Sequence, residues 1–373
     1  MMNIGFDAKR LFFNQRGLGN YGRDTVRILS HVEPDNRYFL FTPNTANALP
    51  FTLQDNCHIV QPEGLLQQQL PSVWRTYWSC RDIKRLHLDI YHGLSHELPI
   101  GIEKTGTRSV VTMHDVIFLK FPHLYPYVDR KLYERKYLRS CRVADVVIAI
   151  SEQTKRDLIE YASLDERTIK VVYQGCQPMF NLEVTAAEKT RVTTSYNLPK
   201  NFLLNVGAIE KRKNQELILR AMVETKIDLP LVIVGRPTSY LDELRAIVKK
   251  TGLESRVIFL TSVPASDLPA LYQLSSLFIY PSLFEGFGIP ILEALNSGIP
   301  VIASTGSCME ETGGQDTCYI DPQNAEELGH AITTLLNDEK KRNKMVEAGK
   351  QHAGLFSDKA IADNLFSIYK NLR

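Results

Sequence analysis

The chain has 373 residues, of which 44% are hydrophobic and 23% charged, and its formal net charge is +2. This length suits two domains with separate cores, and the composition excludes a disordered chain. A charge so near neutrality gives no reason to expect nucleic acid as a partner.

The cysteines and the apolar runs indicate in which compartment of the cell the protein is expected. The six cysteines are scattered and form no CxxC pair, so the sequence predicts neither a zinc site nor a disulfide framework. The N-terminus has no secretory-signal pattern, and no apolar run is long enough to span a bilayer. We expect a cytoplasmic protein, or one that is peripheral to the inner face of the membrane.

The first half alternates short apolar runs with amphipathic stretches. Buried strands are predicted at Asn3–Asp7, Tyr38–Thr42, Ser109–Met113 and Val146–Ile150. Ser151 is a suitable N-cap for the last of three predicted helices, which are Asn20–His31, Asp129–Arg142 and Glu152–Tyr161. This alternation predicts a parallel sheet covered by helices.

The second half repeats the pattern. Strands are predicted at Phe202–Val206, Leu231–Val234, Val257–Leu260, Leu277–Tyr280, Val301–Ala303 and Cys318–Ile320. Asn324 and Glu327 have the spacing of a helix-start pair. Helices are predicted at Tyr240–Thr251, Pro290–Asn296, Ala325–Leu336 and about Ser357–Leu372.

The sequence therefore predicts an α/β protein of two Rossmann-like, doubly wound parallel-sheet domains that face a central cleft. We expect a first domain at residues 1–180, a linker at 181–200, a second domain at 201–355 and a C-terminal helix at 356–373 that packs back on the first domain. Ligands of such sheets bind at the carboxyl ends of strands, near helix N-termini.

Gly17–Gly22 spells GxGxxG, but the context of a dinucleotide site is missing. About ten residues separate it from the preceding strand, and no carboxylate follows the next strand at Phe41–Asn44. We interpret the glycines either as a surface loop that leads into a helix or as a loop whose backbone approaches a ligand phosphate.

Several other catalytic patterns are absent from the sequence. There is no P-loop, no HExxH, no GxSxG and no Asp-x-Asp pair, so we predict no metal and no cofactor. His92 and His96 are four residues apart, but Gly93 and Pro99 favour a loop with ordinary polar contacts over metal ligation.

The most informative segment follows the predicted strand Leu277–Tyr280. Gly286 and Gly288 free the backbone to present N–H groups, and Pro290 suits the first position of a helix. Glu285 and Glu293 lie on either side of this turn and can accept hydrogen bonds from vicinal hydroxyls. Each feature alone also fits a simple turn with a helix-start acid, but together they favour ligand binding.

This segment, Glu285 to Glu293 with the residues up to Ser304, resembles the signature of the retaining family-four glycosyltransferases of GT-B fold. The resemblance covers nearly the whole chain. It implies that Glu293 binds the nucleotide ribose and Glu285 the donor sugar. The backbone expected to contact the sugar and diphosphate is that of Gly286, Phe287, Gly288 and Ile289.

Further residues match the family at separate places. Arg212 and Lys213 correspond to the pair that grips the diphosphate, although Ala208 replaces an arginine common in the family. His114 corresponds to a histidine that contacts the donor sugar, with Asp115 to orient it. The resemblance also places Gly19 near the donor phosphates and Val263 near the nucleotide base.

The resemblance implies a retaining, nucleotide-sugar-dependent hexosyltransferase that makes a polysaccharide or glycoconjugate. We expect the second domain to bind the donor, with mannose or a similar hexose, and the first to bind a glycan or lipid-linked acceptor. Same-face displacement and a double displacement with a carboxylate nucleophile both stay open. The rival functions are a catalytically silent partner subunit that binds sugar nucleotide and a sugar-nucleotide epimerase of the same architecture.

Two features of the first half bear on acceptor and membrane. The predicted helix Asp129–Arg142 is basic and amphipathic, which fits either contact with anionic lipid or a solvated surface. Trp74, Tyr77 and Trp78, together with His92 and His96, could line an acceptor region in the first domain. Packing in the hydrophobic core explains the three aromatic residues about equally well.

Overall fold

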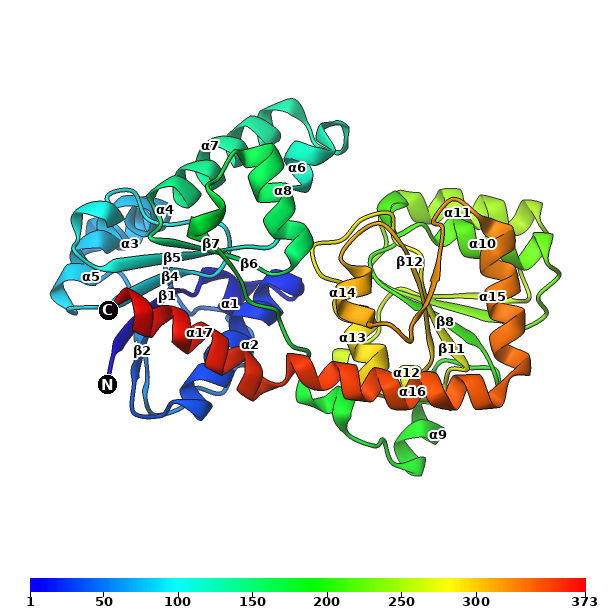
Figure 1. Ribbon diagram of the computed structural model, residues 1–373. Helices are drawn as coiled ribbons and strands as arrows, with labels where there is room; N and C mark the ends of the chain where they lie inside the picture. The colour runs from blue at the N-terminus through cyan, green and yellow to red at the C-terminus, as the bar shows by residue number, and fades with distance from the viewer. The chain divides into compact units, whose positions relative to one another are not determined.

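Two parallel sheets organise the chain in the computed structural model, which describes residues 1–373 apart from the side chain of Leu124 (Figure 1). The chain divides into two units. Unit 1 comprises Met1–Gly175 together with Ser357–Arg373, and unit 2 comprises Cys176–Phe356. The fold class predicted from the sequence, two Rossmann-like α/β domains, is confirmed.

The sheet of unit 1 has seven strands in the order β3-β2-β1-β4-β5-β6-β7, and all its pairs are parallel. The chain order reverses between β1 and β4, which are neighbours in the sheet. The strands are β1 (Asn3–Asp7), β2 (Arg37–Phe41), β3 (Cys57–Val60), β4 (Ile90–Gly93), β5 (Arg108–Met113), β6 (Val146–Ala149) and β7 (Ile169–Val171).

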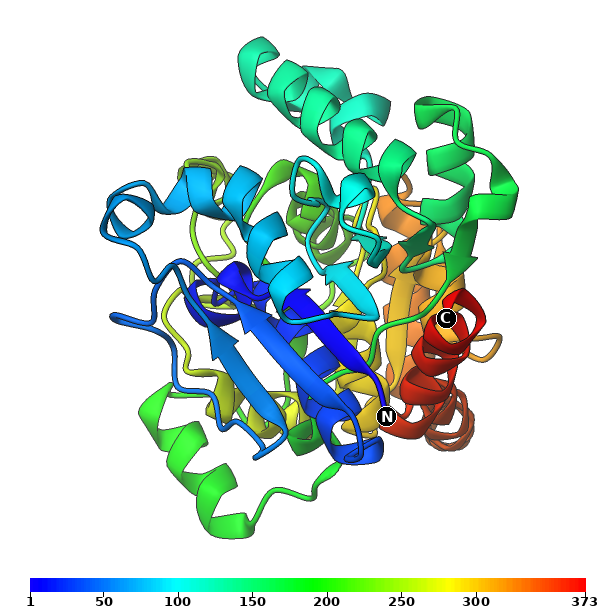
Figure 2. The same cartoon turned by 90° about the vertical axis from the view of Figure 1, so that its left-hand side faces the viewer.

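The helices of unit 1 cover this sheet, and the C-terminal helix α17 packs against α2. Arg27 of α2 forms an ion pair of 2.5 Å with Asp358 at the start of α17. At the other end of α17, Arg373 donates to the Met1 carbonyl, so the two ends of the chain lie side by side (Figure 2). The helices are α1 (Lys9–Phe13), α2 (Gly17–Val32), α3 (Leu65–Gln69), α4 (Pro71–Val73), α5 (Ser79–Arg85), α6 (Ile117–Lys120), α7 (Tyr127–Val143), α8 (Glu152–Ala162) and α17 (Asp358–Leu372).

Unit 2 has a six-stranded parallel sheet in the order β10-β9-β8-β11-β12-β13. Its chain order reverses between β8 and β11. The strands are β8 (Leu203–Val206), β9 (Leu231–Val234), β10 (Val257–Leu260), β11 (Leu277–Tyr280), β12 (Val301–Ser304) and β13 (Cys318–Ile320).

The hydrophobic core of unit 2 lies between the sheet and helices α10, α11 and α15, while α13 packs with α14 and α16. The predicted cap Asn324 accepts a hydrogen bond from the Glu327 N–H, as Ser151 does from Thr154 in unit 1. The helices are α9 (Ala186–Ser195), α10 (Gln215–Glu224), α11 (Tyr240–Lys250), α12 (Leu268–Leu274), α13 (Ile289–Asn296), α14 (Met309–Gly313), α15 (Ala325–Asn337) and α16 (Glu339–Ala353).

Three of the differences between the structure and the sequence expectations concern predicted loops and the linker. His92 lies in strand β4 and not in a loop, because it pairs with Phe6 of β1 and Val110 of β5 inside the sheet. The glycine-rich segment is helical from Gly17 onward and is not a loop. Helix α9 occupies part of the range 181–200 expected as a linker, and it packs against α12.

Gly19 packs against the turn that precedes α2. A Cβ at this position would lie 1.8 Å from the carbonyl oxygen of Asn14, whereas a Cβ at Gly17 would meet nothing within 4 Å. We expect Gly19→Ala to destabilise the protein by about 2 kcal/mol or more, because backbone would have to shift. Gly17→Ala is the matched control and should be neutral or slightly stabilising. Equal urea midpoints for the two variants would contradict this packing role.

Candidate functional site

The loop between β11 and α13 carries most of the predicted donor residues. Gly288 has a positive φ of 99° and caps α13, so a side chain there would strain the turn. The loop is fixed from behind, since Ser307 accepts a hydrogen bond from the Glu285 N–H and Thr312 donates to the Phe287 carbonyl. Glu285 and Phe287 are buried, while Gly286 and Ile289 are half-buried.

Glu285 forms a buried ion cluster with the two predicted cations. Lys213 Nζ lies 2.6 Å from Glu285 Oε1, and Arg212 Nη1 lies 2.9 Å from Oε2. Burial by itself raises the pKa of Glu285, but the charges of Lys213 and Arg212 outweigh it and lower this pKa to about 2. The structure therefore brings together residues that follow β8 and β11, the two strands at the topological switch point of unit 2.

Two tyrosines hold the predicted glutamates, and sequence reasoning missed both. Tyr280 donates to Glu285 Oε1 at 3.1 Å and accepts from Lys213 Nζ at 2.7 Å. Tyr272 of α12 donates to Glu293 Oε2 at 2.8 Å. Burial and the nearby carboxylates raise the pKa of both phenols well above 10, so they stay protonated as donors. Tyr272 and Tyr280 look like ordinary core residues in the sequence, and nothing in it marks them.

In unit 1, His114 follows β5 and is buried. Its Nε2 lies 2.9 Å from the Leu94 carbonyl oxygen, which can only accept, so Nε2 carries the proton. Asp115 accepts from the Ile117 N–H at the start of α6. A backbone carbonyl partner such as Leu94 leaves no signal in a sequence.

The remaining predicted residues belong to other elements of the two units. Gly19 belongs to α2 of unit 1, and Val263 is half-buried in the turn after β10 of unit 2. Of the suggested acceptor region, Trp74 is fully buried and donates to Asp82, so it is a core residue. His92 is also internal, between Thr112 Oγ1 at 2.7 Å and the Tyr369 hydroxyl at 2.6 Å.

Buried histidines make unit 1 sensitive to acid. Burial lowers the pKa of His92 to about 3, that of His114 to about 4, and that of His96 well below its usual 6.5. As the pH falls from 6.5 towards 4, the unfolded chain binds protons that the folded chain refuses, so stability is present above pH 6.5 and is lost below it.

We expect a loss of about 2 kcal/mol per histidine between pH 7 and pH 5, measured by urea unfolding. His92→Asn should reduce the dependence on pH by about one proton, whatever it does to stability at pH 7. His330→Gln is the control, because this histidine is exposed on α15. Identical slopes in wild type and His92→Asn would contradict the assignment.

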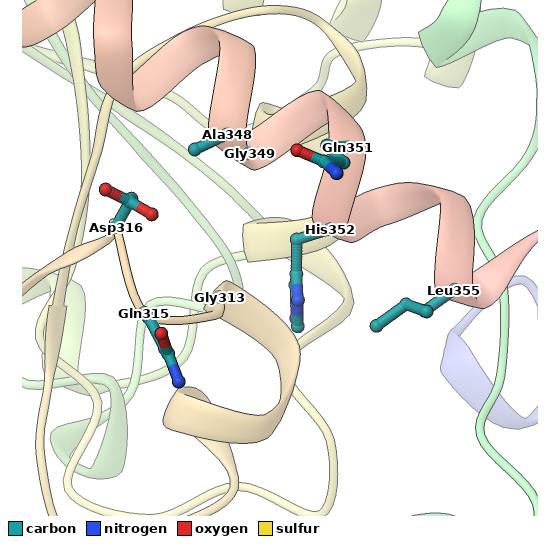
Figure 3. Close-up of a pocket in the computed structure, with 8 residues that line it drawn as sticks. All are labelled: Gly313, Gln315, Asp316, Ala348, Gly349, Gln351, His352 and Leu355. Atoms are coloured by element: carbon teal, nitrogen blue, oxygen red, sulfur yellow. The ribbon is translucent and has the colours of Figure 1, made fainter.

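A pocket of about 300 Å³ lies between the end of α14 and helix α16 (Figure 3). It contains none of the predicted site residues. Its His352 packs on Phe356, which packs on Phe287 of the β11–α13 loop. The pocket therefore lies behind that loop.

No group of three or more His, Cys, Asp or Glu side chains in the described part of the chain is placed to hold a metal ion. No helix there is long and apolar enough to cross a membrane.

Known proteins resemble this chain over both of its units. Two family models match, Glycosyltransferase Family 4 over residues 30–178 and Glycosyl transferases group 1 over residues 187–352. The O-antigen chain mannosyltransferase B of Escherichia coli is 30% identical over 390 aligned positions that cover 100% of both chains.

Solved structures share the fold at lower identity. A sucrose-phosphate synthase from Thermosynechococcus elongatus superposes with a TM-score of 0.78 at 19% identity, covering 100% of this chain and 99% of that one. Anabaena Alr3699/HepE, solved in complex with UDP and glucose, gives 0.76 at 20% identity and covers 100% of both chains. The chain therefore belongs to the group 1 glycosyltransferases of family 4, with the two-domain GT-B fold.

Proposed function

We propose that the protein is a retaining hexosyltransferase that moves mannose or a similar hexose from a nucleotide-diphosphate sugar to a glycan or lipid-linked acceptor in polysaccharide or glycoconjugate synthesis. The observation that carries the proposal is the buried cluster of Arg212, Lys213 and Glu285 beside the loop that leads to Glu293. The similarity to an E. coli O-antigen mannosyltransferase supports mannose and a glycan acceptor.

The cluster suits a diphosphate leaving group. Arg212 and Lys213 now hold one carboxylate, and a diphosphate with more negative charge would compete for the same two cations. Its arrival would release Glu285 towards the hydroxyls of the donor sugar, while Glu293 binds the ribose. The same two cations would stabilise the charge that develops on the leaving phosphate, which is why we propose a reaction without metal or cofactor.

The geometry favours same-face displacement over a covalent intermediate. Lys213 and Arg212 engage both oxygens of Glu285 and lower its pKa to about 2, so the carboxylate is a weak nucleophile while they hold it. Once the diphosphate has released it, we propose that the carboxylate accepts hydrogen bonds from the sugar hydroxyls and does not attack the anomeric carbon. In unit 1, Nε2 of His114 is committed to Leu94 and His114 is neutral, so we propose that it contacts substrate rather than acting as the general base.

The test is a panel of UDP-, GDP-, ADP- and dTDP-sugars offered to the purified protein. We expect one GDP-hexose to raise the melting temperature and to be consumed with an acceptor glycan, giving a product of unchanged anomeric configuration by NMR. Binding without turnover would favour the silent partner subunit, and release of an epimerised sugar nucleotide the epimerase. No stabilisation by any of them would refute the donor site.

We also propose peripheral contact with anionic membrane through α7. Tyr127, Val128 and Leu132 are 67%, 75% and 47% exposed, and the exposed cations Lys131, Arg135 and Lys136 surround them. Leu132→Asp should weaken co-sedimentation with vesicles of anionic lipid several-fold. Leu182→Asp is the control, because Leu182 of unit 2 is 64% exposed and so even more accessible than Leu132. Equal binding of both variants and wild type would exclude this surface.

A further inference from the structure

The loop that follows β4 contains two buried polar groups that lack a hydrogen-bond partner among the residues that the structure describes. Ser95 is 2% and His96 6% exposed. Across the described part of the chain, neither Ser95 Oγ nor His96 Nδ1 finds a hydrogen-bond partner. A buried polar group without a partner costs folding free energy. A group of this kind that is kept in a protein therefore suggests a function, such as binding a ligand.

The orphan nitrogen of His96 is a donor. His96 Nε2 accepts the His114 backbone N–H at 3.1 Å, so in the neutral ring the proton sits on Nδ1. Burial, then the proximity of His114 and Arg10, lowers the pKa of His96 and keeps the ring neutral. The orphan pair is therefore one N–H donor and one hydroxyl, on two residues that follow each other in the loop.

The loop is held rigidly in a conformation that is itself costly. His96 has a positive φ of 68°, which a non-glycine residue rarely adopts. The His96 N–H bonds to the Thr112 carbonyl, and the Leu98 N–H bonds to Ser140 Oγ at 2.9 Å. Glu97 pairs with Arg75 at 3.0 Å. Rigid support of a strained residue with unused donors is typical of a binding loop.

The position and charge of the loop point to an anion. Arg10 follows β1 and Ser95 and His96 follow β4, and these strands are the neighbours at which the order of the unit 1 sheet reverses. Ligands of open parallel sheets bind at this switch point. Arg10 is half-buried, and its charge acts on both His96 and His114. Arg75 holds both Asp7 and Glu97 in ion pairs, so both carboxylates already have a cationic partner other than Arg10.

We propose that Ser95 and His96, with Arg10, form an anion-binding subsite in unit 1 that takes a phosphoryl group of a substrate, separate from the donor site of unit 2. That the second site is a donor site rests on the proposed function. The subsite itself rests only on the orphan pair, the strained loop and the positive charge.

The probe is inorganic phosphate, added to the full chain in the Lys213→Met/Glu285→Gln background. This background removes one of the two cations of the unit 2 cluster and leaves Arg212 with its partner Glu210. We expect phosphate to shift the His96 Nδ1 resonance in long-range 1H–15N spectra and to raise the melting temperature. In that background, Ser95→Ala and His96→Gln should each bind phosphate about tenfold more weakly.

The two variants also separate binding from folding. Glutamine can still accept the His114 N–H but lacks a donor at the Nδ1 position, and alanine removes an orphan hydroxyl, so both should fold and Ser95→Ala should melt at or above the wild-type temperature. The KM for the sugar nucleotide should stay unchanged in Ser95→Ala.

Three results would overturn the subsite. One is phosphate binding of unchanged strength in both variants. Another is a His96 response to methyl α-mannoside and none to phosphate, which would assign a sugar hydroxyl. The third is a crystal structure with a buried water bonded to Ser95 and His96, together with no response to phosphate.

Discussion

Replacing Glu293 with alanine is expected to weaken binding of the sugar nucleotide by about a hundredfold, because two hydrogen bonds from a ribose to a charged carboxylate are each worth about 1.5 kcal/mol. The fold should be little affected, since Glu293 is only half-buried in α13. The measurement is a titration of the best sugar nucleotide by calorimetry in wild type and variant.

Tyr272→Phe gives the graded control for this experiment. It keeps the carboxylate of Glu293 and removes only the 2.8 Å hydrogen bond that orients it, so we expect a loss of only several-fold. Glu224→Ala changes an exposed glutamate of α10 and should have no effect. If Glu293→Ala bound as tightly as Glu224→Ala, the ribose assignment would be wrong.

Replacing Lys213 with methionine is expected to reduce both activity and stability. Glu285 would stay buried and would keep only Arg212 as a cationic partner. Removing one partner of a buried ion pair costs about 3 kcal/mol of folding free energy. If Lys213 stabilises the leaving diphosphate, kcat should also fall by about a hundredfold or more.

The double variant Lys213→Met/Glu285→Gln distinguishes the two effects. Removing both charges should recover most of the lost stability in urea unfolding, because no uncompensated carboxylate is left in the cluster. Activity should not return, since neither the cation nor the sugar-binding carboxylate is restored. Recovery of activity along with stability would mean that the cluster is only structural.

The sequence by itself determined the elements and the chemistry of the donor loop. Alternating apolar runs and amphipathic stretches encode local burial, so strands such as Leu231–Val234 and Leu277–Tyr280 were predicted with the bounds found in the structure. The donor loop from Glu285 to Glu293 could be identified from the sequence because its glycines, its proline and its two glutamates are close together in the chain. Strand β4 was not predicted, because Gly93 and nearby polar residues interrupt the apolar run that marks a buried strand.

The tertiary structure alone decided which distant side chains meet. Lys213 and Glu285 touch because β8 and β11 are neighbours in the sheet, and strand order follows from long-range packing that no local period encodes. The hydroxyl of Tyr272 reaches Glu293 from another helix. The orphan state of Ser95 and His96 is a property of everything around them, so it becomes visible only when every neighbouring donor and acceptor has been placed.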